Sequence, residues 1–139
     1  MQSHAEKAVQ LFEQGCSCSQ AVFTAYAEDY GLDRKTAMKV SVALGGGGGR
    51  MRETCGAVAG MMLVAGLKYG NTEPGDAEAK SAALEAAQKL AERFKADQGS
   101  IICKELLGLA PLRGTTEFLP QKKPCKELVR KAAELLESL

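Results

Sequence analysis

The sequence predicts an all-α protein: a compact single-domain bundle of about six to seven helices around a buried central helix. Apolar residues recur at helical spacing through most of the 139 residues. Glycine, proline and helix-capping residues divide these segments at short intervals. No segment shows the apolar–polar alternation of a competing strand. Because 139 residues is the size of one ordinary domain, residues 1–139 are expected to form a single redox-type helical domain.

The first two predicted helices span residues 6–14 and 17–31. Gly15 ends the first, since glycine readily adopts the left-handed conformation that follows a helix. Ser17 and Gln20 stand three apart at the start of the second, which is the spacing of a capping box. The sequence therefore predicts both where the first helix ends and where the second one begins.

A third helix begins at Asp33, a capping residue, and its apolar positions are Ala37, Val40 and Leu44. Five consecutive glycines, Gly45–Gly49, follow it. Each glycine costs about 1 kcal/mol relative to alanine inside a helix, so the run is expected to form a tight loop. Such a loop lets backbone approach another group closely.

The fourth helix, residues 54–70, is apolar on nearly every side and is expected to be the buried central one. The fifth, residues 76–98, is long and amphipathic. Its apolar side is predicted to carry Ala83, Leu84, Ala87, Leu90, Ala91 and Phe94. A short sixth helix at residues 101–107 and a last one at residues 125–136 complete the chain.

Composition excludes several classes of function. The 18 Lys and Arg residues nearly balance the 17 Asp and Glu residues, and no basic stripe is interleaved with aromatics, so no nucleic-acid partner is expected. The longest apolar run, residues 61–67, is too short to span a bilayer, so no membrane partner is expected. No signal-peptide pattern is visible at the N-terminus, which predicts a cytoplasmic protein with reduced thiols.

Four of the five cysteines stand where a predicted helix begins: Cys18, Cys55, Cys103 and Cys125. A sulfur in the first turn of a helix faces free N–H groups and the positive end of the helix dipole, which favour a thiolate. Short connections favour antiparallel neighbours, so the second, fourth and sixth helices should start at one end of the bundle. The long loop before Cys125 allows the last helix to start there too. The four sulfurs are therefore expected to converge.

The blocks around these cysteines resemble the C_GCAxxG_C_C family, which is named for its cysteine and glycine pattern. The matching segments are residues 18–22, 54–60, 66–70 and 103–108, followed by Cys125. The resemblance implies redox activity. Related iron–sulfur domains of split-Soret cytochromes imply a [2Fe–2S] cluster as one use of the cysteines. Haem is not implied, because the chain has no Cys-x-x-Cys-His motif, and Cys16 is not one of the cysteines that name the family.

Three functions remain open at this point. The first is electron transfer by an iron–sulfur or other metal cluster held by the four cysteines. The second is a metal-free thiol–disulfide oxidoreductase, in which Cys55 attacks because Arg50 and Arg52 are near in sequence, and Cys18 or Cys103 resolves. The third is a helical oligomerisation module with incidental cysteines.

Several further residues and partners belong to these hypotheses. Gly56 and Gly60 are expected to allow close helix packing, and Gly56 could let a cluster approach the N–H groups of the helix start. The residues expected to border a bound cofactor are Gly56, Gly60, Arg50 and Arg52, and the two arginines could also bind an anion. The Gly45–Gly49 loop is expected to cover the thiol site. His4, the only histidine, is expected to lie in a frayed terminus without a catalytic role. The expected partners are a redox protein or a small thiol or disulfide, and the fifth helix could pair with a second copy of the chain.

Overall fold

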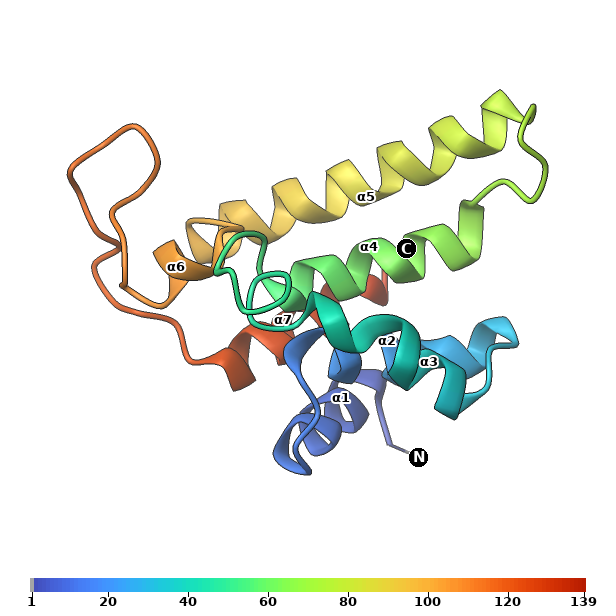
Figure 1. Cartoon of the computed structure of the whole chain (residues 1–139), viewed down its shortest axis with the longest axis horizontal. Helices are drawn as coiled ribbons and strands as arrows, with labels where there is room; N and C mark the ends of the chain where they lie inside the picture. The colour runs from blue at the N-terminus through green and yellow to red at the C-terminus, as the bar shows by residue number, and fades with distance from the viewer. Residues whose placement is uncertain (1) are drawn as a thin grey trace.

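The computed structural model describes residues 2–139 and confirms the all-α fold class (Figure 1). No strand occurs among these residues, and the one β-type contact is an isolated bridge between Thr54 and Ile102. Seven α-helices and two short 3-10 helices follow one another: α1 His4–Glu13, α2 Cys18–Ala27, η1 Glu28–Tyr30, α3 Arg34–Ser41, η2 Val42–Leu44, α4 Gly56–Tyr69, α5 Ala77–Gln98, α6 Cys103–Leu106 and α7 Cys125–Leu136.

Two helices, α2 and α4, share the centre of the bundle. Eight of the ten residues of α2 are buried, and α4 buries the face that carries Val58, Met61 and Val64. Helices α1 and α7 pack on α2, while α5 lies along α4 in the opposite direction (Figure 1). The prediction of a buried α4 is confirmed, and α2 is as central as α4.

The predicted start of α2 is also confirmed. Ser17 Oγ accepts a hydrogen bond from the Gln20 N–H, and Gln20 Oε1 accepts one from the Ser17 N–H at 3.0 Å. This capping box satisfies donors that helix geometry leaves free. It fixes where α2 begins and therefore where Cys18 lies.

Three sequence predictions about helix faces and starts are wrong. Val40 and Leu84, expected on buried faces, are 51% and 62% exposed, because α3 contacts the bundle mainly through Ala37 and α5 through Leu90 and Phe94. Thr54 does not open α4. It lies in the β-bridge, and the helix begins two residues later.

The prediction that His4 frays is wrong as well. Ser3 caps α1, and the His4 ring stacks on Tyr26 with their centroids 4.0 Å apart. His4 Nε2 lies 2.6 Å from Asp29 Oδ2, and His4 Nδ1 lies 2.8 Å from Glu137 Oε1. The histidine therefore ties the start of α1 to η1 and to the end of α7. Among residues 2–139, no helix combines the length and the apolar character needed to cross a bilayer.

Candidate functional site

Four cysteine side chains line one cavity of about 170 Å³: Cys18, Cys55, Cys103 and Cys125. Three of them are the first residue of a helix, and Cys55 is the residue immediately before α4. The rest of the wall is largely apolar, with Phe12, Leu106, Leu107 and Leu128. The predicted convergence of the four helix starts is confirmed.

Backbone pairing holds the starts of α4 and α6 side by side. The Cys55 N–H donates to the Ile101 carbonyl at 2.8 Å, and the Cys103 N–H donates to the Glu53 carbonyl at 2.5 Å. These two bonds flank the bridge between Thr54 and Ile102. Side chains alternate along extended backbone, so Cys55 and Cys103 point to the same side of the bridge. The two sulfurs form one pair of the site.

A glycine brings the start of α2 against the start of α4. A Cβ added to Gly56 would lie 3.2 Å from both Cys18 Cβ and the Ser19 backbone nitrogen. One turn later, a Cβ on Gly60 would lie 3.0 Å from Val22 Cβ. Gly56 lines the cavity, whereas Gly60 does not, so Gly60 acts through helix packing.

Cys125 reaches the cavity from a distant part of the chain. The Lys123 N–H donates to the Leu106 carbonyl at 2.7 Å, which ties the segment before α7 to the end of α6. Cys125 then meets Cys18, whose thiol donates a hydrogen bond to the Cys125 sulfur. These two cysteines form the second pair.

The two sulfurs of this second pair differ in acidity. The hydrogen bond from Cys18, followed by the charge of Arg52, lowers the pKa of Cys125 to about 6 despite partial burial. The same hydrogen bond, together with burial and the neighbouring cysteines, raises the pKa of Cys18 far above its ordinary value. Cys125 is therefore the more acidic thiol of the pair, and Cys18 is the less acidic one.

The sequence predicts that Cys55 is the attacking nucleophile, but the burial and the pKa of its thiol do not suit that role. It is 4% exposed, and burial raises its pKa to about 11, although the N–H groups of Val58 and Ala57 act in the opposite direction. The helix start alone does not make a thiolate when the sulfur is desolvated. The residue best suited to be a free thiolate is Cys125.

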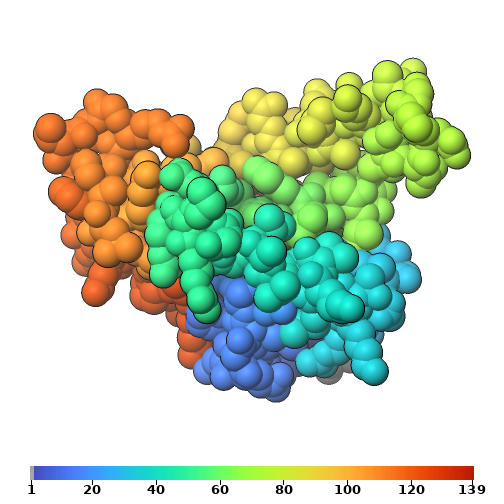
Figure 2. All heavy atoms as spheres, viewed as in Figure 1, coloured from blue at the N-terminus to red at the C-terminus, as the bar shows by residue number. Residues whose placement is uncertain are grey.

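The glycine loop borders the cavity, and in Figure 2 it is the green segment at the front of the molecule. Gly46 and Gly47 line the cavity, and their N–H groups have no acceptor within residues 2–139. Arg52 lines it too and donates from Nη1 to Cys103 Sγ at 3.8 Å. Arg50 does not line it, so the predicted action of Arg50 on Cys55 is not supported.

Cys16 lies outside the cavity, where its thiol contacts Met38 Sδ at 3.8 Å. Within the described chain, no group of three or more His, Cys, Asp or Glu residues is arranged to hold a single metal ion. The sulfurs are thus gathered in two pairs around one cavity rather than around one point.

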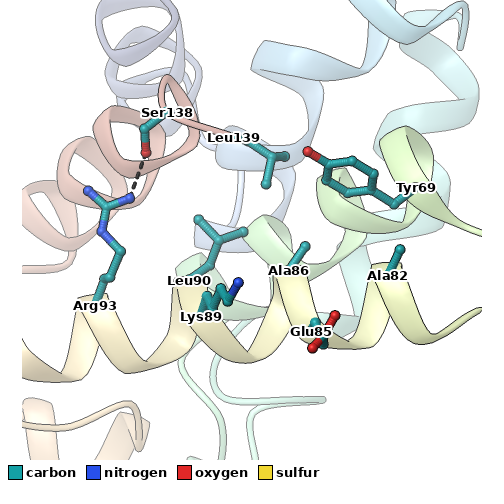
Figure 3. A pocket seen from close by; sticks show the side chains of 9 residues that line it. All are labelled: Tyr69, Ala82, Glu85, Ala86, Lys89, Leu90, Arg93, Ser138 and Leu139. Carbon is teal, nitrogen blue, oxygen red and sulfur yellow. Dashed lines mark hydrogen bonds between the residues drawn. The ribbon is translucent and has the colours of Figure 1, made fainter. Parts of the chain in front are cut away.

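A separate cavity of about 320 Å³ lies between α5, the end of α4 and the C-terminal residues (Figure 3). Arg93 Nη1 donates to Ser138 Oγ at 2.6 Å across one side of it, and Tyr69 borders the other. None of the residues predicted for a site lies there.

Sequence reasoning missed the bridge that aligns Cys55 with Cys103. The paired segments, residues 52–55 and 101–104, are far apart in the chain and too short to show a strand pattern. The sequence predicted that the Gly45–Gly49 run covers the thiol site, but it did not show which of these glycines form the cavity wall, namely Gly46 and Gly47. The unbroken run of glycines was the one signal that pointed there.

Comparison with known proteins finds one family model, described as "Putative redox-active protein (C_GCAxxG_C_C)", which matches residues 16–139. No curated protein and no solved structure matches the chain. The matched range contains all four cysteines of the cavity and the glycine loop.

Proposed function

This chain belongs to the C_GCAxxG_C_C family, and on that premise we propose that it is an electron-transfer protein that holds an iron–sulfur cluster. The ligands would be Cys18, Cys55, Cys103 and Cys125. One observation carries the proposal: four cysteine side chains from four helix starts line a single, otherwise largely apolar cavity. Thiolates are the protein ligands of such clusters.

The grouping of the sulfurs favours a binuclear cluster over a single ion. A structural zinc ion needs four ligands within about 2.3 Å of one centre. No three candidate ligands in residues 2–139 are so arranged. A [2Fe–2S] cluster takes four cysteines over two irons. The pairs Cys18 with Cys125 and Cys55 with Cys103 match that division.

The residues of the cavity fit such a group electrostatically. The neighbouring cysteines raise the pKa of Cys18, so four thiolates cannot share this space without added positive charge. Arg52 supplies part of that charge. The free N–H group of Gly47, which lines only the cysteine cavity, provides a donor for sulfur, and such a donor raises the reduction potential of a cluster. A bound cluster supplies one-electron chemistry.

A second candidate, thiol–disulfide exchange, is favoured by the thiolate of Cys125 beside the thiol of Cys18. The Cys125 thiolate would attack a substrate disulfide, R–S–S–R′, and release R′S⁻. Cys18 would give its proton to R′S⁻ and attack Cys125 Sγ, which forms a disulfide and releases RS⁻. Two electrons would pass from the protein to the substrate. The cluster of the first candidate would exchange electrons with a redox protein. The thiols of the second candidate would react with a small disulfide.

Anaerobic purification with iron, sulfide and visible-absorption analysis separates the two candidates. We expect about two irons and two sulfides per chain, in line with the cluster stoichiometry. Serine in place of Cys18, Cys55, Cys103 or Cys125 should each reduce or abolish the chromophore, while Cys16→Ser is the matched control and should keep it. A colourless protein with five titratable thiols, even after anaerobic reconstitution, would contradict the cluster.

The second candidate has its own readout. If no cluster forms, Cys18→Ser should trap a mixed disulfide on Cys125, because no resolving thiol remains. If all four serine variants match wild type in both assays, the chain would be a helical module with incidental cysteines. The pairing of α5 with a second copy stays a prediction, to be tested by sedimentation.

A further inference from the structure

A larger cavity, of about 560 Å³, lies on the other side of the glycine loop. It is bordered by the loop, by the start of α2 and by η2. Three residues line both this outer cavity and the cysteine cavity: Ser17, Gly46 and Arg52. The two spaces therefore share a wall, and the outer one has the size of a small-molecule site.

The wall of the outer cavity carries positive charge only. Arg50 and Arg52 are its sole charged residues, and neither forms an ion pair with a carboxylate within residues 2–139. The neighbouring Glu53, which could have neutralised them, pairs instead with Lys104 at 3.3 Å. Guanidinium groups bind carboxylate and phosphate oxygens with two parallel hydrogen bonds.

Backbone conformation supplies an independent reason to look for a role of these arginines. Arg50 has φ of 63° and Arg52 has φ of 62°, in the left-handed region that glycine adopts without strain. They follow Gly46–Gly49, four glycines in the same region. Among residues 2–139, the two arginines are the only non-glycine residues at positive φ. Strain at such positions is tolerated where the side chain has a function that glycine cannot supply.

The backbone adds a donor at the shared wall. The Gly46 N–H has no acceptor in the described chain, whereas the following loop N–H groups of residues 48–53 donate to carbonyls of residues 43–48. Consecutive N–H groups in turn conformations form concavities that bind anions. A free N–H next to two arginines that have no carboxylate partner completes the donor set for one oxyanion.

We propose that the outer cavity binds a small molecule through a phosphate or carboxylate group held by Arg50, Arg52 and the Gly46 N–H. Arg50 supplies charge from the side remote from the cysteines. Arg52 lies between the two cavities. If the thiol–disulfide candidate of the proposed redox function holds, a reactant anchored in this way would lie against the wall of the redox site, and its small disulfide substrate would carry an anionic group. The binding site itself does not depend on that function.

The test is a titration of the full-length protein at low, constant ionic strength with inorganic phosphate and, in parallel, with malonate. Amide NMR shifts of residues 45–52 report binding, and the tighter of the two probes identifies the preferred group. We expect saturable shifts in this loop. Arg50→Gln should weaken binding at least about tenfold, because a hydrogen bond to a charged group contributes 1.4 kcal/mol or more.

Two matched variants make the test specific. Arg113→Gln removes an exposed arginine outside the cavity and should leave the affinity unchanged. Arg50→Gly removes the same charge without backbone strain, so it should lose binding while its melting temperature stays at or above that of wild type. This variant separates lost binding from lost folding.

Three results would overturn the inference: no saturable shift with either probe, equal weakening by Arg113→Gln and Arg50→Gln, or wild-type affinity in Arg50→Gly. Iron content measured on the same samples keeps the two proposals apart. Phosphate or malonate binding without a cluster would contradict the redox centre alone, and a cluster without anion binding would contradict this site alone.

Discussion

Cys18 and Cys125 show how one contact sets two acidities in opposite directions. A thiol that donates to a neighbouring sulfur stabilises the thiolate of that neighbour and makes its own deprotonation costly. The pKa of Cys125 falls to about 6, and that of Cys18 rises. The position of each cysteine at a helix start is the same, so the contact, not the helix dipole, makes the difference.

This contact can be tested by alkylation of the reduced, cluster-free protein. The rate at Cys125 should rise with pH around a midpoint near 6. Cys18→Ala removes the donor, so the midpoint should move up toward the ordinary cysteine value of about 8.5. Cys16→Ala, which alters a sulfur outside the cavity, is the control and should leave the midpoint in place. Mass spectrometry of the Cys125 peptide gives the rates, and an unmoved midpoint in Cys18→Ala would contradict the pairing.

His4 is a second residue whose surroundings decide its chemistry. Burial by itself lowers its pKa, but the hydrogen bonds to Asp29 and Glu137 and the negative charges of these residues outweigh burial, so the pKa is raised. Both ring nitrogens face a carboxylate, which suits the protonated ring. A raised pKa means that the folded state binds this proton more tightly than the unfolded state.

The contribution of His4 to the free energy of unfolding should therefore depend on pH. The stabilisation by His4 is fully present below the unfolded pKa of about 6.5 and is lost as pH rises through the folded pKa. The difference in free energy of unfolding between wild type and His4→Gln should therefore shrink as pH rises above about 6.5. Both carboxylates are more than half exposed, so we expect a change of less than about 1 kcal/mol. Urea denaturation from pH 5 to 9 measures it, and parallel curves would disprove the role.

At the scale of elements, the close approach of α2 and α4 places the first two cysteines together. The contact is made by Gly56 and Gly60, on the face of α4 that meets α2. Gly66, six residues further along the same helix than Gly60, has no atom within 4 Å of an added Cβ. Helix α4 therefore contains a glycine in a tight contact, Gly60, and a glycine with free space around it, Gly66, which can be compared.

Gly60→Ala should destabilise the protein by about 1–3 kcal/mol, because the new methyl group meets Val22 and the Ser19 carbonyl at 3.0–3.1 Å. Gly66→Ala should instead stabilise it by up to about 1 kcal/mol, since alanine is the better helix former and the space is free. Chemical denaturation of both variants provides the comparison. Equal effects of the two substitutions would contradict a specific contact at Gly60.

At the scale of the whole molecule, the proposed cluster would connect four helix starts that are distant in sequence. A group that binds only the folded chain stabilises it by mass action, by about 2.7 kcal/mol at a hundredfold excess over its dissociation constant. The cluster-loaded protein should thus melt at a higher temperature than the same protein after anaerobic iron removal by a chelator. Calorimetry checks this. Identical melting of both forms would mean that the four cysteines do not hold the iron together.

The sequence by itself determined the helices, their order and the four cysteines that line one cavity. These follow from local physics: apolar spacing, the Ser17 capping box, the glycine stops and the cysteines beside helix starts. Local patterns in the sequence do not show which distant segments of the chain come into contact. The sequence could not show that Cys55 and Cys103 share a bridge, or that Cys18 meets Cys125.

Only the tertiary structure decided which sulfur has a lowered pKa and which arginine reaches the cysteine cavity. A pKa depends on burial and on neighbours in space, so the buried Cys55 and the paired Cys125 differ although both stand at helix starts. Arg50 and Arg52 are two residues apart, yet only Arg52 lines the cysteine cavity. Short-range sequence patterns encode helices, whereas the site depends on which helix ends the fold brings into contact.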